Sequence, residues 1–390
     1  MTDDDASGGD QSLDSGDERS QGNLELFFDL VFTFAMAQVT QLVLHNMSWS
    51  GMGQAALALL AVWWAWVGYT WLTNTFETAR VGHQSLIMAA MAAMLVAAVA
   101  LPTAFTSGAL VFGVALSVVR LIHVGKFLAY SRREDDADLE SAARRIAPAF
   151  VVAPALIVLA AFVDHPYREL CWVGAALIDY GAPAVLGMGG FRVSASYFVE
   201  RHGSIVIIAL GEAILELGGG AKDLHRLGVI AALVLGVAVS ATLWWTYFGL
   251  TGGAKQRLAQ ANGVERAVLA RDAYSYLHLP LIAGIMFFAV GEHVAVAHVD
   301  APLELLPALA MTGGVALFYV GEVAYRWRDH HQFTADRALT AMACAAVFPA
   351  ALQLPALATM SILAGIGFAR VGWELWRRPQ IGPVTAGAPR

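Results

Sequence analysis

ELFFDLVFTFAMAQVTQLVL, residues 25–44, is a mostly apolar stretch that is long enough to cross a bilayer as one helix. A spanning helix needs about 20 such residues. Eleven similar runs follow, so the chain is predicted to be an all-α membrane protein with about twelve transmembrane helices. The runs lie at about 24–44, 51–72, 84–101, 107–130, 146–163, 170–190, 201–219, 227–250, 273–297, 303–325, 337–352 and 355–376.

The composition supports this assignment. Of 390 residues, 58% are hydrophobic and only 14% are charged, whereas a soluble domain has about 25% charged residues. Residues 1–22 are rich in Gly, Ser and Asp, and we expect them to form a disordered acidic tail. Residues 377–390 form a short C-terminal tail.

The positive charges alternate between successive loops. Eighteen of the 24 Lys and Arg residues lie in the terminal segments and in every second loop, and only Arg168, Lys222 and Arg226 lie in the intervening loops. Loops rich in Lys and Arg stay in the cytoplasm. The pattern therefore predicts that both termini are cytoplasmic, in a multi-pass protein of the bacterial inner membrane.

Two halves of the chain, 24–190 and 200–376, share short motifs and are predicted to be six-helix repeats. Trp63-Trp64 in the second run recurs as Trp244-Trp245 in the eighth, and the GVAL string at 113–116 recurs at 314–317. An even number of spans in each copy makes the two copies parallel. Chance matches between apolar strings are the alternative explanation.

Carboxylates inside the first run are the first candidates for a functional site, because a charged group at the bilayer centre costs roughly 2.5–3.5 kcal/mol on insertion scales. Glu25 and Asp29 are four residues apart and share one helix face with Thr33. Glu25 is also suited to a helix N-terminus. Asp29 is interpreted either as lining a polar pathway or as locking the fold by pairing with an arginine.

The seventh run contains the strongest candidate, Glu212, which lies near its middle. Glu216 lies on the same face one turn later. Asp29 and Glu212 are expected at comparable depths in the two repeats. Arg201 and His202, at the start of this run, are interpreted as anchors at the membrane surface.

The remaining spans also carry ionisable residues. Arg120 and His123 share a face of the fourth run, and Arg120 should need an acidic partner. Its expected partners are Asp29, Glu212 and Glu322.

Further ionisable residues lie in the sixth, ninth and tenth runs. Asp179 of the sixth run is expected to bond freed backbone groups near a proline, and Glu292-His293 lies in the ninth. Glu322 of the tenth run is expected to pair with Arg326 four residues later.

An aromatic block at residues 63–71 closes the second run and is interpreted as an interfacial aromatic belt. The chain has no phosphate-binding GxxxxGK[ST] loop, no HExxH motif and no set of Cys and His ligands. No cofactor, metal or nucleic-acid partner is therefore expected.

Three strings together identify a family resemblance: ELFFDLVFTFAMAQ, WWAWVGYTWLTN and ERHGSIVIIALGEAI. They resemble the bacterial low temperature requirement A family of multi-pass membrane proteins, and the resemblance covers about 24–376. The family motif corresponds here to Glu25, Phe28, Asp29, Phe32, Trp64, Asn74, Glu200, Arg201, Gly203, Gly211 and Glu212. The first run is also similar to the first helix of the endosomal-lysosomal potassium channels, except that Phe28 replaces a serine.

These patterns favour a secondary transporter or ion-conducting protein for a small solute or cation, with buried carboxylates where the repeats meet. The chain is not expected to be an enzyme. The alternatives are a structural or regulatory membrane protein and a membrane-embedded lipid-modifying enzyme.

Overall fold

Helices account for the membrane-spanning part of the chain, because lipid offers backbone groups no other hydrogen-bond partner. The computed structural model describes residues 22–75, 81–133, 135–249, 252–331 and 333–377. Within these ranges no strand occurs, and one isolated bridge joins Pro302 to Pro355. The predicted acidic tail lies almost wholly outside the described residues, and so does the C-terminal tail after Arg377.

The first half of the chain holds six long helices. They are α1 (Asn23–His45), α2 (Trp49–Thr75), α3 (Val81–Ala100), α4 (Ala109–Arg133), α5 (Ala137–Ala160) and α6 (Tyr167–Leu186), with a short 3-10 turn, η1 (Leu101–Thr103), before α4. The fifth predicted run starts nine residues too late, because the first turns of α5 carry charged residues and lack an apolar signal.

The second half is less regular. It comprises α7 (Ala195–Gly220), α8 (Leu227–Phe248), α9 (Gly252–Gln260), α10 (Gly263–Leu269), η2 (Ala270–Tyr276), α11 (His278–Ala297), α12 (Leu305–His330), α13 (Ala335–Ala346), α14 (Phe348–Ala351) and α15 (Ala356–Arg377). η2 is a π-helix, a form that is rare and is often found at functional sites. It joins α10 to α11.

Eleven helical stretches of the described chain are long and apolar enough to cross a membrane. They correspond to eleven of the twelve predicted runs. The exception is the run at 337–352, which α13 and α14 cover as two shorter helices. The protein is thus an all-helical, multi-pass membrane protein.

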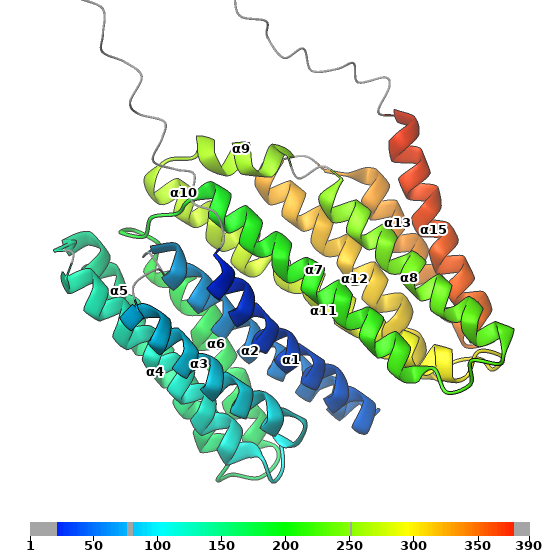
Figure 1. Cartoon of the computed structure of the whole chain (residues 1–390), viewed down its shortest axis with the longest axis horizontal. Coiled ribbons are helices and arrows are strands. Elements are labelled where there is room, and N and C mark those ends of the chain that lie inside the picture. Colours follow the sequence, from blue (N-terminus) through cyan, green and yellow to red (C-terminus); the bar gives the residue numbers. More distant parts are fainter. Residues whose placement is uncertain (1–21, 76–80, 134, 250–251, 332, 378–390) are drawn as a thin grey trace, which may run out of the picture.

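The helices form two groups that lie side by side (Figure 1). α1 to α6 make one bundle and α7 to α15 make the other. α1 and α2 contact α7 and α11 along the seam between the groups. The proposed internal repeat remains a prediction, and its matching Trp pairs differ in environment. Trp63 is fully buried, whereas Trp244 is 45% exposed.

α1 and α7 run in the same direction across this seam. Arg201, near the start of α7, pairs with Asp29, near the start of α1. Gln41, near the end of α1, donates to Glu216 near the end of α7. The bundle end at which α1 and α7 begin also holds the C-terminus of α15 (Figure 1). We call it the basic end, because the Arg-rich loops lie there.

Glycines allow α11 and α12 to pack backbone against backbone. A Cβ on Gly314 would lie 2.4 Å from the Phe288 backbone nitrogen, and one on Gly291 would lie 2.4 Å from that of Met311. Real Cβ atoms do not approach backbone this closely. Small residues commonly permit such close helix packing in membranes.

We therefore expect Gly314→Ala to force α11 and α12 apart and to lower the thermal unfolding temperature by several degrees. Gly313 is the matched control, because a Cβ there meets only Leu309 of its own helix at 3.4 Å. Gly313→Ala should be neutral or slightly stabilising, since Ala favours a helix more than Gly does. Equal unfolding temperatures for the two variants in detergent would contradict the close packing.

Candidate functional site

A buried ion pair joins the two helix groups. Nη1 of Arg201 lies 2.8 Å from Oδ2 of Asp29, and both side chains are fully buried. The indole Nε1 of Trp66 donates to the other carboxylate oxygen of Asp29 at 2.8 Å. The Asp29 carboxylate is thus neutralised by a cation and held by a second hydrogen bond.

This pair corrects two predictions. Arg201 and His202 are not surface anchors, because both are fully buried. Asp29 and Glu212 do not lie at the same depth, because Asp29 lies beside Arg201 and Glu212 follows eleven residues later. Eleven residues span about 16 Å of helix. Sequence spacing could not show which residue of α7 lies opposite Asp29.

The other candidates in α1 have structural contacts. Glu25 is 2% exposed and lies in the first turn of the helix. The hydroxyl of Thr33 donates to the carbonyl oxygen of Asp29 at 2.8 Å, within its own helix. Thr33 therefore stabilises local backbone and does not continue a polar stripe.

The aromatic block of α2 is a buried part of the seam, so its interpretation as an aromatic belt is wrong. Trp63 and Trp66 are fully buried, and Trp71 is 8% exposed. The indole nitrogens of Trp63 and Trp71 donate to the carbonyl and the hydroxyl of Ser275 at 2.8 and 2.9 Å. Ser275 belongs to η2, so the π-helix receives the first bundle's aromatic side chains.

Arg120 pairs with Asp179 of α6, not with any of its three expected partners. Its guanidinium also stacks over the ring of Phe150 at 4.1 Å. Asp179 therefore neutralises a buried cation, and does not serve the backbone as predicted. His123, one turn further along α4, is 6% exposed and lines a small apolar cavity of ≈ 60 Å³.

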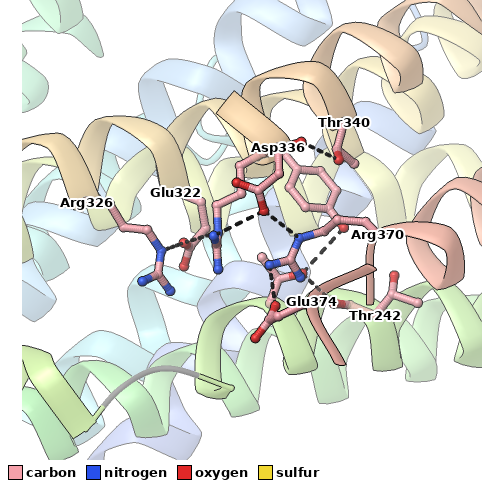
Figure 2. A network of polar contacts seen from close by, with 10 residues as sticks. Thr242, Glu322, Arg326, Asp336, Thr340, Arg370 and Glu374 are labelled. Carbon is pink, nitrogen blue, oxygen red and sulfur yellow. Dashed lines mark hydrogen bonds and ion pairs between the residues drawn. The ribbon is translucent and has the colours of Figure 1, made fainter. Parts of the chain in front are cut away.

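Glu322 belongs to a buried network that joins α8, α12, α13 and α15 (Figure 2). It pairs with Arg326 at 2.7 Å, as predicted, and also lies 3.3 Å from Nε of Arg337. Arg370 of α15 donates to Glu374 at 2.6 Å and to the hydroxyl of Thr246 at 2.8 Å. Arg337 and Arg370 were not predicted as members of this network.

A different arrangement occurs towards the opposite end of the bundle. Glu212 and Glu216 of α7 are 7% and 8% exposed, and Glu292 of α11 is fully buried. Glu216 accepts from Gln41 at 2.8 Å and lies 3.2 Å from Nδ1 of His293. We call these five residues the acidic cluster; they come from α1, α7 and α11.

Two carboxyl groups of the acidic cluster have no compensating partner. Neither oxygen of Glu292 has a hydrogen-bond partner, and Glu212 has no hydrogen bond or ion pair to another described residue. Glu292 and Glu212 each lie close enough to Glu216 to interact with it electrostatically.

Gly236 of α8 leaves space for the Glu292 carboxyl, because a Cβ there would lie 2.7 Å from Oε2 of Glu292. Glu216 thus lies near two further carboxyls, those of Glu212 and Glu292, and contacts the imidazole of His293. In the described ranges no group of three or more His, Cys, Asp or Glu side chains could hold a metal ion.

The sequence indicated Glu212, Glu216 and Glu292 as candidates, but it did not predict that they lie close together. It missed Gln41 and gave His293 no partner. The only feature of the sequence that marked Arg201 as important was its place in the family motif. Because Arg201 lies at the start of an apolar run, the sequence favoured a position at the membrane surface. Contacts between helices decide these pairings.

Removal of one charge from the Asp29–Arg201 pair should destabilise the fold strongly. A buried charge left without its partner costs about 3–5 kcal/mol. Asp29→Asn should therefore lower the unfolding temperature markedly, and the double variant Asp29→Asn/Arg201→Gln should recover most of the loss. Thermal unfolding followed by Trp fluorescence measures both.

Arg192→Gln is the matched control, because Arg192 pairs with Asp136 at the surface and is largely exposed. Exposed pairs contribute only about 0–1 kcal/mol. A double variant as unstable as Asp29→Asn alone would show that charge pairing is not what Asp29 provides.

Comparison with known proteins agrees with this architecture. The family model for the bacterial low temperature requirement A protein (LtrA) matches residues 21–371, which include every helix discussed above except the last residues of α15. A Rhizobium meliloti (strain 1021) protein, described as uncharacterized protein RA0937, is 30% identical over 311 residues. The alignment covers 76% of this chain and 75% of that relative. The chain therefore belongs to the bacterial low temperature requirement A (LtrA) family.

Proposed function

We propose that this protein moves a proton or a small cation across the bacterial inner membrane, as a secondary transporter or ion-conducting protein. The observation that carries the proposal is the acidic cluster, in which Glu216 contacts the imidazole of His293 and lies near two further carboxyls, those of Glu212 and Glu292. Two other buried carboxylates are already neutralised: Asp29 pairs with an arginine at the seam, and Asp179 pairs with Arg120 in the first bundle. The acidic cluster is therefore the place where an ion can be exchanged.

The energetics of burial favour a bound proton or cation at Glu292. An ionised carboxylate without a partner is costly to remove from water, and Glu292 also lies near the acidic Glu216. Either a proton on Glu292 or a cation shared with Glu216 removes this cost. Protonatable carboxyls inside membrane spans often mark proton and ion pathways.

The position of the acidic cluster supports the same proposal. It lies on α1, α7 and α11, where the two helix groups meet. Transporters built from repeats bind their substrates at such an interface. His293 bridges α11 to α7, because its Nδ1 lies 3.0 Å from the carbonyl oxygen of Glu216 and 3.2 Å from its carboxylate. An ion bound at Glu216 would compete with this bridge and so alter the contact between α7 and α11.

A structural role for the whole chain is the second candidate. The observation that favours it is the pairing of three buried carboxylates elsewhere in the described chain, since Asp29, Asp179 and Glu322 all contact an arginine. In that case the acidic cluster would hold one fixed protonation state and conduct nothing. Lipid-modifying chemistry stays a prediction from the sequence.

The test is ion flux in liposomes that contain the purified full-length protein. An internal pH-sensitive dye reports protons driven by an imposed potassium diffusion potential, and a cation-sensitive dye replaces it in a second series. Glu216→Gln and Glu292→Gln should each reduce flux at least tenfold. Both changes keep the side-chain shape, and Glu292→Gln leaves no charge to bury, so both variants should fold.

Glu304→Gln is the matched control, because Glu304 is exposed at the same end of the bundle. It makes the same charge change outside the acidic cluster and should alter flux less than twofold. Wild-type flux equal to that of empty liposomes in both series would support the structural role. Equal losses in all three variants would exclude the acidic cluster as the exchange site.

A further inference from the structure

A groove lies between α3 and α4 at the basic end, on the lipid-facing side of the first bundle. Its volume is ≈ 400 Å³. Leu86 and Leu121 on its walls are 43% and 52% exposed, as expected for side chains that face lipid. The lining residues are Leu86, Leu121, Ile122, Gly125, Lys126, Ala129, Tyr130 and Arg133.

The polar lining residues lie on one face of α4. Lys126, Tyr130 and Arg133 follow at spacings of four and three residues, so they form a single row towards the end of the helix. Arg133 is exposed and makes no ion pair with another described residue. Its neighbour Arg132 differs, because its Nε donates to Glu140 at 3.0 Å.

The apolar part of the groove is open because of Gly125. A Cβ at this position would meet no atom within 4 Å. The groove thus has an unobstructed floor next to Leu121 and Ile122, and the exposed cation of Arg133 lies about two turns further towards the end of α4. This polarity matches an amphipathic molecule with an anionic head.

We propose that the groove binds one anionic phospholipid, with its phosphate at the exposed Arg133 and an acyl chain along Leu86, Leu121 and Gly125. Tyr side chains favour the headgroup level of a bilayer, so Tyr130 is compatible with a headgroup at Arg133, whereas the ammonium group of Lys126 is buried. The basic end is also the end that loop charge assigns to the cytoplasmic leaflet, where anionic lipids attract basic residues.

A second hollow between the same helices provides an internal comparison. It lies at the opposite end, has a volume of ≈ 430 Å³ and is lined by Leu95, Val96, Val99, Ala100, Thr103, Ser107, Gly108 and Val111. This lining contains hydroxyl groups but no basic side chain. Selectivity for an anionic headgroup therefore belongs to the groove at the basic end.

Native mass spectrometry of the detergent-purified full-length protein tests the proposal. Phosphatidylglycerol and phosphatidylcholine with identical acyl chains are added in equal amounts. We expect preferential retention of one phosphatidylglycerol. Because one basic residue near a membrane surface contributes about 1 kcal/mol, Arg133→Gln should weaken phosphatidylglycerol binding about fivefold. Gly125→Leu should abolish the bound lipid by filling the floor.

Two matched controls accompany these variants. Arg132→Gln removes an adjacent charge that does not line the groove, and it should change binding less than twofold. Gly372→Leu places the same side chain on α15, where a Cβ also meets no atom within 4 Å, and it should retain the lipid. Glycerol 1-phosphate, the headgroup fragment alone, should not displace the bound lipid.

Three results would overturn the proposal. They are equal retention of the two lipids, equal losses for Arg132→Gln and Arg133→Gln, and retention of phosphatidylglycerol by Gly125→Leu. Displacement of the lipid by glycerol 1-phosphate would also overturn it, and would indicate that the polar lining residues of α4 bind a soluble phosphate compound.

Discussion

The ion pair between Asp29 and Arg201 is the contact on which the seam between the two helix groups depends. A single charge at this position would have neither water nor lipid headgroups to solvate it, so each residue requires the other. The pair sets the register of α1 against α7 together with the hydrogen bond from Gln41 to Glu216. Trp66 adds a third helix to the same contact. The aromatic side chains of α2 and the π-helix η2 then pack around this level of the seam.

The two ends of the bundle treat buried charge differently. Arginines at the basic end lie in pairs or networks, as at Asp29 and Glu322, and this arrangement stabilises helix contacts. Towards the opposite end, carboxyls outnumber their partners, and Glu292 has none. A buried carboxylate without a partner raises the free energy of the protein when it is ionised. A bound proton or cation removes this cost. The proposed ion exchange follows from this imbalance, whereas the pairs near the basic end provide a scaffold that holds α1, α7 and α11 in place.

Much of the fold follows from the sequence, because lipid restricts the chain to apolar helices of a known length. Runs of apolar residues correctly predicted eleven helical stretches that are long and apolar enough to cross a membrane, and the family resemblance was confirmed. The run at 337–352 was predicted as one helix, but residue 347 separates α13 from α14. Apolar length alone does not detect such a break. The resemblance could not supply a solute, because neither the family description nor the relative's name states one.

The candidate site was predicted less completely than the fold. The cost of burying charge in lipid singled out Glu212, Glu216 and Glu292, and all three are buried in the structure; their role in a functional site stays a prediction. The sequence could not assign partners, because residues far apart in the chain, such as Arg120 and Asp179, meet only after the helices pack. Trp63 shows the same limit: an aromatic residue near a span end is compatible with a membrane surface or with a buried seam, and only packing distinguishes them.

The most direct test of the account is the protonation of Glu292 in the purified protein, measured by infrared difference spectroscopy of wild type against Glu292→Gln. The account predicts that the wild type shows a carboxylic acid C=O band at neutral pH that this variant lacks, and that Asp29→Asn/Arg201→Gln leaves the band unchanged. A spectrum in which Glu292→Gln removes only a carboxylate band, in protein free of bound cations, would contradict it.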